Sequence, residues 1–321
     1  MPSPIATLIA SLAVIASTAT AATAQEPVTF RYRFDPGEKL TYAISTSVKQ
    51  TQNVNGQAVK SEFSVAQRVE REVAQIDGDG RAVLNCRNQK FTAVMQVGPL
   101  GKYQFDSTRD DNDSSGTLGA AATPLYKAMS SAVIKVTLSP RGEVLAVKGL
   151  QEALADVLKS NPLTAQLAGG ASSNEGAKAS YAEHFLQFPE KTLSPGDTWE
   201  LPLQLTIPQV GKVSGKTTCR YEGTQEANGR TLHRVTASSD VTVDVDIDRD
   251  GVTATGKIEM TESSGTSLFD NSTGRLISRE STTTTSGDLV VVAGGQTLPI
   301  RQTQTQTHKI RLVENATKTS R

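Results

Sequence analysis

The segment VTVDVDIDRDGVTATGK holds the residues best suited to bind a metal ion. Asp246, Asp248 and Asp250, followed by Gly251, match the first half of a calcium loop, in which alternate carboxylates supply oxygen ligands. Lys257 then occupies the twelfth position, where such a loop needs a bidentate Glu. The same aspartates alternate with valines and isoleucine, which is typical of a strand with one acidic face.

Two interpretations of this acidic strand stay open. A loosely held cation would relieve the repulsion between neighbouring carboxylates. A solvated edge strand, whose charges discourage pairing with another sheet, explains the same pattern. Because the loop is incomplete, we predict no metal centre and keep the three aspartates as candidate ligands only.

The three histidines, His184, His233 and His308, lie far apart in the sequence. No H-E-x-x-H motif occurs, so the sequence does not favour a zinc centre. We expect His184 at the surface or at a helix end, and His233 and His308 in strands with their rings facing solvent. A G-x-S-x-G nucleophile elbow and a phosphate-binding loop are also missing from the sequence. We therefore predict a non-enzymatic protein with no catalytic residue and no cofactor.

The sequence contains two cysteines, Cys86 and Cys219, each on the apolar side of an alternating segment. In an exported protein they could form a disulfide. Two buried thiols that act as small apolar side chains would fit the pattern as well. The sequence does not decide between these alternatives, because it does not give the separation of the two Cα atoms.

Charge and the N-terminus restrict the partners and the compartment. With 33 basic and 33 acidic side chains the formal charge is zero, which argues against nucleic acid as a partner. The apolar run Ile5–Ile15 and an A-x-A signal that ends at Ala24 predict a signal peptide over 1–24. No stretch approaches the roughly 20 apolar residues of a membrane span. We expect an exported chain, periplasmic or secreted, without a transmembrane segment.

Apolar and polar residues alternate with a period of two through most of the remaining chain. The runs 30–34, 40–44, 59–76 and 301–313 each place apolar side chains on one face. An apolar content of 37% and a mean hydropathy of -0.31 fit strands that keep one face wet. These patterns predict a mainly β protein.

One segment has a strong helical period. Leu150, Leu154, Val157 and Leu158 fall on one helix face and could line a lipid pocket. Packing of the helix against a sheet produces the same pattern and is the commoner cause. Shorter helices are expected at 124–132 and 181–187, a polar loop at 108–119 and a flexible insert at 169–180.

Two similar phrases, DPGEKLTY at 35–42 and SPGDTWEL at 194–201, indicate an internal duplication. Turn glycines follow in the same order in both halves. We predict two related antiparallel meanders that form a curved or barrel-like sheet around one shared core, with a short helical connector packed on it. The first repeat spans 25–149, the connector 150–187 and the second repeat 188–321, and the turn glycines are Gly37, Gly80 and Gly142 and then Gly196, Gly229 and Gly274.

The runs LSPRGEVLAVKGLQEAL at 138–154 and FPEKTLSPGDTWEL at 188–201, with the early FDPGEKLTY, carry a resemblance. They are similar to an uncharacterised family of exported bacterial proteins, known only as a domain of unknown function. The resemblance implies an exported β-rich protein and supplies no catalytic residue. More distantly, the pattern is similar to periplasmic lipoprotein carriers, in which a curved sheet wraps around helices and holds acyl chains.

The leading hypothesis is therefore an exported, non-enzymatic protein that binds a hydrophobic or lipid ligand in its curved sheet. An envelope structural or protein-interaction module is the alternative. A hydrolase with an unrecognised site is the third hypothesis.

Overall fold

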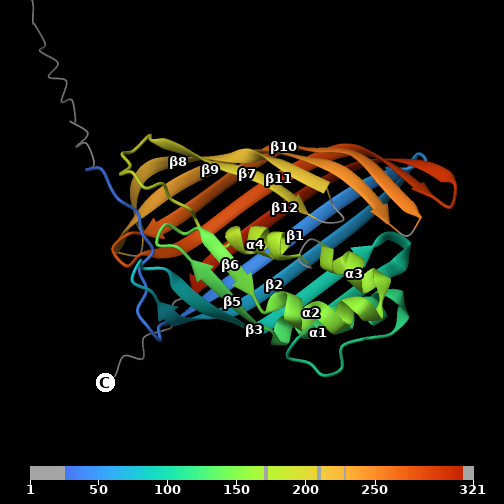
Figure 1. Cartoon of the computed structure of the whole chain (residues 1–321), viewed down its shortest axis with the longest axis horizontal. Coiled ribbons are helices and arrows are strands. Elements are labelled where there is room, and N and C mark those ends of the chain that lie inside the picture. Colours follow the sequence, from blue (N-terminus) through green and yellow to red (C-terminus); the bar gives the residue numbers. More distant parts are fainter. Residues whose placement is uncertain (1–25, 170–172, 208–210, 228, 250, 314–321) are drawn as a thin grey trace, which may run out of the picture.

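Twelve antiparallel strands form one curved sheet in the computed structural model, which describes residues 26–169, 173–207, 211–227, 229–249 and 251–313 (Figure 1). The predicted signal peptide lies outside these residues. The strands of the first half are β1 (Lys39–Val54), β2 (Gln57–Ile76), β3 (Ala82–Val97), β4 (Gly101–Asp106), β5 (Val133–Leu138) and β6 (Val144–Lys148). Those of the second half are β7 (Thr198–Ile207), β8 (Gly211–Ala227), β9 (Arg230–Arg249), β10 (Val252–Asp270), β11 (Arg275–Ala293) and β12 (Gln296–Val313).

The strand order shows two meanders joined at the middle of the sheet. The order is β6-β5-β3-β2-β1-β12-β11-β10-β9-β8-β7, and β4 pairs with β3 outside this path. β1 and β12 pair from Thr41↔Val313 to Val54↔Ile300, so the two ends of the described chain meet at the centre. The prediction of a mainly β fold with a curved sheet is confirmed. The origin of the two meanders by duplication stays a prediction.

Helices lie against the concave side of the sheet (Figure 1). α4 contacts both β6 and β7, which are the two ends of the strand order, so it fills the gap that the unclosed sheet leaves. α1 packs on β3 and β4, and α2 packs on α1 and α3. The bounds are Gly98–Leu100 for the 3-10 helix η1, Gly116–Ser131 for α1, Leu150–Ser160 for α2, Pro162–Ala168 for α3 and Asn174–Ala182 for α4. No helix in the described part of the chain is long and apolar enough to cross a membrane.

Two helix predictions were wrong in position. α1 begins at Gly116, inside the predicted loop, because the alanine-rich stretch that follows favours helix and buries its small side chains. α4 occupies part of the predicted flexible insert, and the Ser173 side chain accepts a hydrogen bond from the Gly176 amide at 3.0 Å to cap it. The predicted helix at 181–187 is mostly absent, because after α4 the chain turns to bury Phe185 and Leu186. Residues 170–172 lie outside the described part.

An aromatic cluster closes one end of the concave side. The segment 30–34, predicted as a strand, is extended but bonds to loops: the Tyr32 amide donates to the Pro140 carbonyl at 2.7 Å. Phe30 stacks on Phe188 at a centroid distance of 4.7 Å, and Phe269 contacts both rings. These residues make the end of the sheet beside the N-terminal segment a packed core, which we call the closed end (left in Figure 1).

Candidate functional site

The two faces of the sheet differ in charge. On the convex face carboxylates pair with basic side chains across neighbouring strands, at Glu280–Lys309, Asp288–Arg301 and Glu200–Lys216. The register of the described strands places no Asp or Glu on the concave face between the terminal turns. That face carries two arginines, Arg71 on β2 and Arg279 on β11. It is therefore a cationic and otherwise uncharged surface.

Apolar side chains line the concave face at the end opposite to the aromatic cluster. All belong to the ends of strands that meet there, all are half-buried, and none is among the side chains that form or pack against the main core. We call them the open-end set: Val48, Val54, Leu203, Leu205, Val213, Val241, Val243, Ile247, Ile258, Met260, Leu289, Val291, Leu298 and Ile300. A folded chain rarely leaves so many apolar side chains gathered and partly wet without a use for them.

Amides and hydroxyls line the middle of the concave face. The Gln50 and Gln52 side chains both donate to Oε1 of Gln302, at 3.0 and 3.4 Å. Thr283 and Thr285 lie on the neighbouring strand at the level of Gln306 and Gln304. This band separates the open-end set from the arginines, so the concave face passes from apolar to polar to cationic along its length.

Arg71 lies at the closed end between two aromatic rings. Its guanidinium carbon is 4.2 Å from the centroid of Tyr42 and 4.6 Å from that of Phe185. The residue is only 3% exposed, and Nε is occluded without a hydrogen-bond acceptor. Among the described residues no carboxylate forms an ion pair with it. Cation–π contact offsets part of the cost of burying this charge, but a buried cation normally has an anionic partner.

The expectation of solvent-facing histidines was wrong for both strand residues, which are buried. His308 is 4% exposed and its Nδ1 lies 2.8 Å from Oγ1 of Thr46, while Nε2 is occluded without a partner. His233 is buried as well, with Nδ1 2.8 Å from the Tyr221 hydroxyl. The reason is register: both histidines alternate with core residues, and His308 shares its face with Ile310.

The structure also brings together two histidines that the sequence keeps apart. The rings of His184 and His308 are parallel within 3° at a centroid distance of 5.6 Å. Burial and the nearby Arg279 lower the pKa of His308 to about 4. Burial, Arg71 and Arg279 hold the pKa of His184 well below its usual value. Both rings are neutral at pH 7, so they can form hydrogen bonds without adding charge.

The cysteines and the helical leucines belong to the packed interior. Cys86 and Cys219 are free and buried thiols, and burial raises the pKa of each to about 11. Leu150 and Leu154 are buried in the main core, and Val157 and Leu158 pack against it. The geometry of these four residues is that of a helix packed on the protein core.

The acidic strand lies on the convex face. Its segment belongs to β9, which has β8 and β10 on either side, so the interpretation as an edge strand was wrong. Asp246 and Asp248 are exposed, and Asp250 lies outside the described residues. In the register, Asp244 of the same face stands between Lys212 and Lys257, which compensate the negative charge. Within the described part of the chain, no group of three or more metal-ligating side chains could hold a metal ion.

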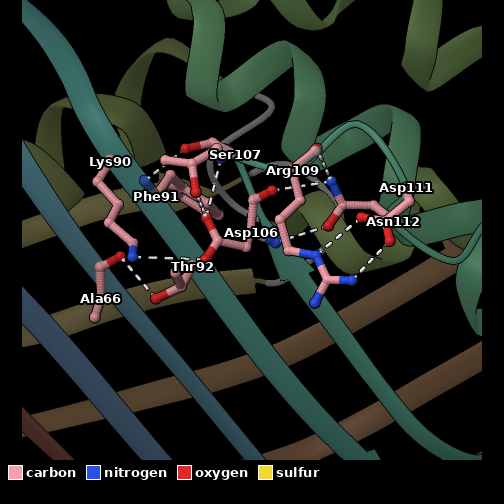
Figure 2. A network of polar contacts seen from close by, with 10 residues as sticks. Ala66, Lys90, Phe91, Thr92, Asp106, Ser107, Arg109, Asp111 and Asn112 are labelled. Atoms are coloured by element: carbon pink, nitrogen blue, oxygen red, sulfur yellow. Dashed lines mark hydrogen bonds and ion pairs between the residues drawn. The ribbon is translucent and has the colours of Figure 1, made fainter.

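The loop after β4 holds another polar network (Figure 2). The Asp106 carboxylate accepts hydrogen bonds from the amide and hydroxyl of Thr108, at 2.9 and 2.7 Å. Asn112 bonds the backbone of Asp106 in both directions, and Arg109 forms a two-pronged pair with Asp111. The acidic groups of this loop are engaged in shaping the loop itself.

Fold and concave face together define a mainly β protein with an unclosed antiparallel sheet around a graded, carboxylate-poor interior. The chain belongs to a family of unknown function, DUF6263, whose model matches residues 79–276. This confirms the expected membership in a domain-of-unknown-function family. No curated protein matches the sequence.

Solved structures show distant likenesses in fold. A structure of lipid–protein interactions in lipovitellin aligns with 90% of this chain and 26% of lipovitellin, at 14% identity and a TM-score of 0.43. An exported protein of YmcC-like fold from Bacteroides fragilis aligns with 89% of this chain and all of its own, at 7% identity and a TM-score of 0.21. The β domain of the Bordetella autotransporter BrkA aligns with 85% of this chain and 100% of its own, at 7% identity and the same TM-score. Likenesses this distant do not bear on function.

Proposed function

We propose that this protein is an exported, non-enzymatic binding protein that holds a hydrophobic ligand on the concave face of its sheet. The observation that carries the proposal is the open-end set: fourteen half-buried apolar side chains at one end of a curved sheet, separate from the closed core. Export is inferred from the N-terminal apolar run and the A-x-A signal.

The chemistry of this surface suits an alkyl chain. Each methylene that leaves water for an apolar surface contributes about 0.8 kcal/mol, so a chain that covers several of these side chains binds without any strong polar contact. The curvature of the sheet lets strands from both meanders contribute, from Leu205 on β7 to Val54 on β1.

Purification of the protein from its native host, followed by lipid extraction and mass spectrometry, tests the proposal directly. We expect co-purifying amphiphiles at a defined ratio to protein. A protein that carries no lipid and displaces no hydrophobic dye overturns the proposal. Cross-linking to a specific protein partner in cells, combined with an empty concave face, would favour an envelope interaction module.

Two neighbouring residues of β11 provide a matched pair of variants. Leu289 lies on the concave face and belongs to the open-end set, whereas Val290 points to the convex face and is 44% exposed. Leu289→Gln is expected to weaken binding of the neutral dye Nile red about tenfold, because the dye loses apolar contact. Val290→Gln should leave binding unchanged. Equal effects of the two substitutions would place the dye elsewhere.

A further inference from the structure

The closed end of the concave face contains a buried cation without a described counterion. Arg71 is 97% buried by complement of its 3% exposure and has no hydrogen-bond acceptor at Nε. The rings of Tyr42 and Phe185 hold the guanidinium in place from both sides. Rings alone do not neutralise a charge, and buried charges in proteins are ordinarily paired.

A second cationic side chain and two neutral rings lie around the same point. Arg279 donates from Nη1 to the carbonyl of Phe185, the residue whose ring covers Arg71. His308 is 96% buried by the same measure, and its Nε2 has no partner. His184 stacks on His308 and feels both arginines. Four side chains from three separate segments therefore converge with unused hydrogen-bonding capacity.

One carboxylate lies close to this cluster. Glu183 follows α4 and interacts with Arg279, but it is exposed to solvent and forms no ion pair with either arginine among the described residues. It therefore leaves Arg71 without a bonded anion. The strand carboxylates are farther away, on the convex face, where lysines and other arginines pair with them.

We propose that Arg71, together with Arg279 and His308, receives the anionic head group of an amphiphile whose apolar chain lies along the open-end set. This inference rests on the proposed function, because it names the class of ligand for the same concave face. The head group is a carboxylate or phosphate, whose oxygens match the planar donors of arginine. The glutamine and threonine band spans the distance between head and chain.

Binding of paired probes to the full chain tests the head-group site. Dodecanoate and dodecanol share a chain and differ in charge, and both are titrated below their aggregation limit by displacement of Nile red. We expect dodecanoate to bind at least tenfold more tightly than dodecanol. Arg71→Met should abolish this preference and leave the affinity for dodecanol within about twofold. The control Arg301→Met, which removes an exposed arginine of the convex face, should preserve the preference.

The outcomes separate this inference from the proposed function. If dodecanol and dodecanoate both fail to displace the dye, the apolar site itself is disproved. If both bind equally well to the unaltered protein, the hydrophobic site stands and the head-group site is overturned. Acetate and inorganic phosphate, offered alone, should displace no dye and compete weakly. Strong competition by either would show a site for small anions and overturn the amphiphile.

A second variant keeps the test valid if Arg71→Met does not fold. Arg279→Gln alters a half-buried member of the cluster and leaves both rings around Arg71 in place. It should reduce the preference for dodecanoate severalfold without weakening dodecanol. A preference that survives both substitutions would overturn the assignment.

Discussion

Two arginines are buried in this protein, and they differ in how their charge is compensated. Arg275 is 8% exposed and lies 4.9 Å from the centroid of Phe34, much as Arg71 lies over its own two rings. Unlike Arg71, Arg275 donates to both carboxylate oxygens of Glu38, at 2.6 and 2.5 Å, and to the carbonyls of Thr273 and Gly274.

The difference separates a structural role from a binding role. Arg275 joins the turn before β1 to the turn before β11, so its bonds hold the closed end together. Arg71 has the same aromatic support without the anion. A protein that compensates one buried charge fully and leaves the other open has a site where a ligand can complete the pairing.

The largest effect is expected when Arg275 is made to resemble Arg71. Glu38→Ala leaves the Arg275 guanidinium buried beside Phe34 without its carboxylate and should lower the free energy of unfolding by roughly 4 kcal/mol. Urea denaturation measures this change. The control Glu280→Ala removes a solvent-exposed partner of Lys309 and should cost less than about 0.5 kcal/mol. Similar losses for both variants would show that burial does not distinguish the two pairs.

Acid should affect the surroundings of Arg71 through the two histidines. Because burial and Arg279 lower the pKa of His308 to about 4 in the folded chain, the unfolded chain binds more protons below pH 6.5. Stability is therefore complete above pH 6.5 and is lost as the pH falls toward 4, by about 3 kcal/mol from this residue. His184 acts in the same direction.

Urea denaturation at pH 7 and at pH 4.5 measures this loss. His308→Gln should remove much of the difference between the two pH values, because Gln keeps polar atoms near Thr46 but does not titrate. A variant with the same acid sensitivity as the original protein would show that other groups cause it.

Alternation in the sequence was sufficient to predict the sheet and could have located both unpaired groups. Arg71 alternates with Val69 and Val73, which places it on the apolar face of its strand. His308 alternates with Ile310 in the same way. An ionisable residue in phase with core positions is therefore a signal to examine, even where a polar neighbour suggests a wet strand.

The convergence of these groups could not be predicted. It depends on pairing between β1 and β12, whose residues are more than two hundred positions apart, and no local pattern encodes that pairing. It also depends on Phe185, which lies in a turn where a helix was expected. Local periodicity gives the face of each strand, whereas long-range register decides which residues meet.

The two Pro-Gly turns sharpen the comparison at a smaller scale. In each, the glycine amide donates to a carbonyl of the second strand, Gly37 to Val73 at 2.8 Å and Gly196 to Tyr221 at 2.7 Å. Both glycines have positive φ, 78° and 96°, and neither Cβ would clash. Only the first turn is followed by an acid that reaches a buried arginine.

Alanine at either glycine should cost about 1 kcal/mol, because the left-handed backbone strains any residue with a Cβ. Gly37→Ala should cost more than Gly196→Ala, since it also shifts Glu38 away from Arg275. Urea denaturation of both variants measures the difference. A larger loss for Gly196→Ala would mean that the Arg275 pair does not depend on the geometry of its turn.

The smallest effect on stability is expected for Arg71→Met, the substitution that abolishes head-group preference. Loss of two cation–π contacts costs about 1–2 kcal/mol, while removal of an unpaired buried charge returns a similar or larger amount. The net change in the free energy of unfolding should therefore lie within about 1 kcal/mol of zero, in contrast to the loss from Glu38→Ala. Urea denaturation without ligand provides the measurement. A loss as large as that of Glu38→Ala would show that Arg71 has a bonded partner and is a structural residue like Arg275.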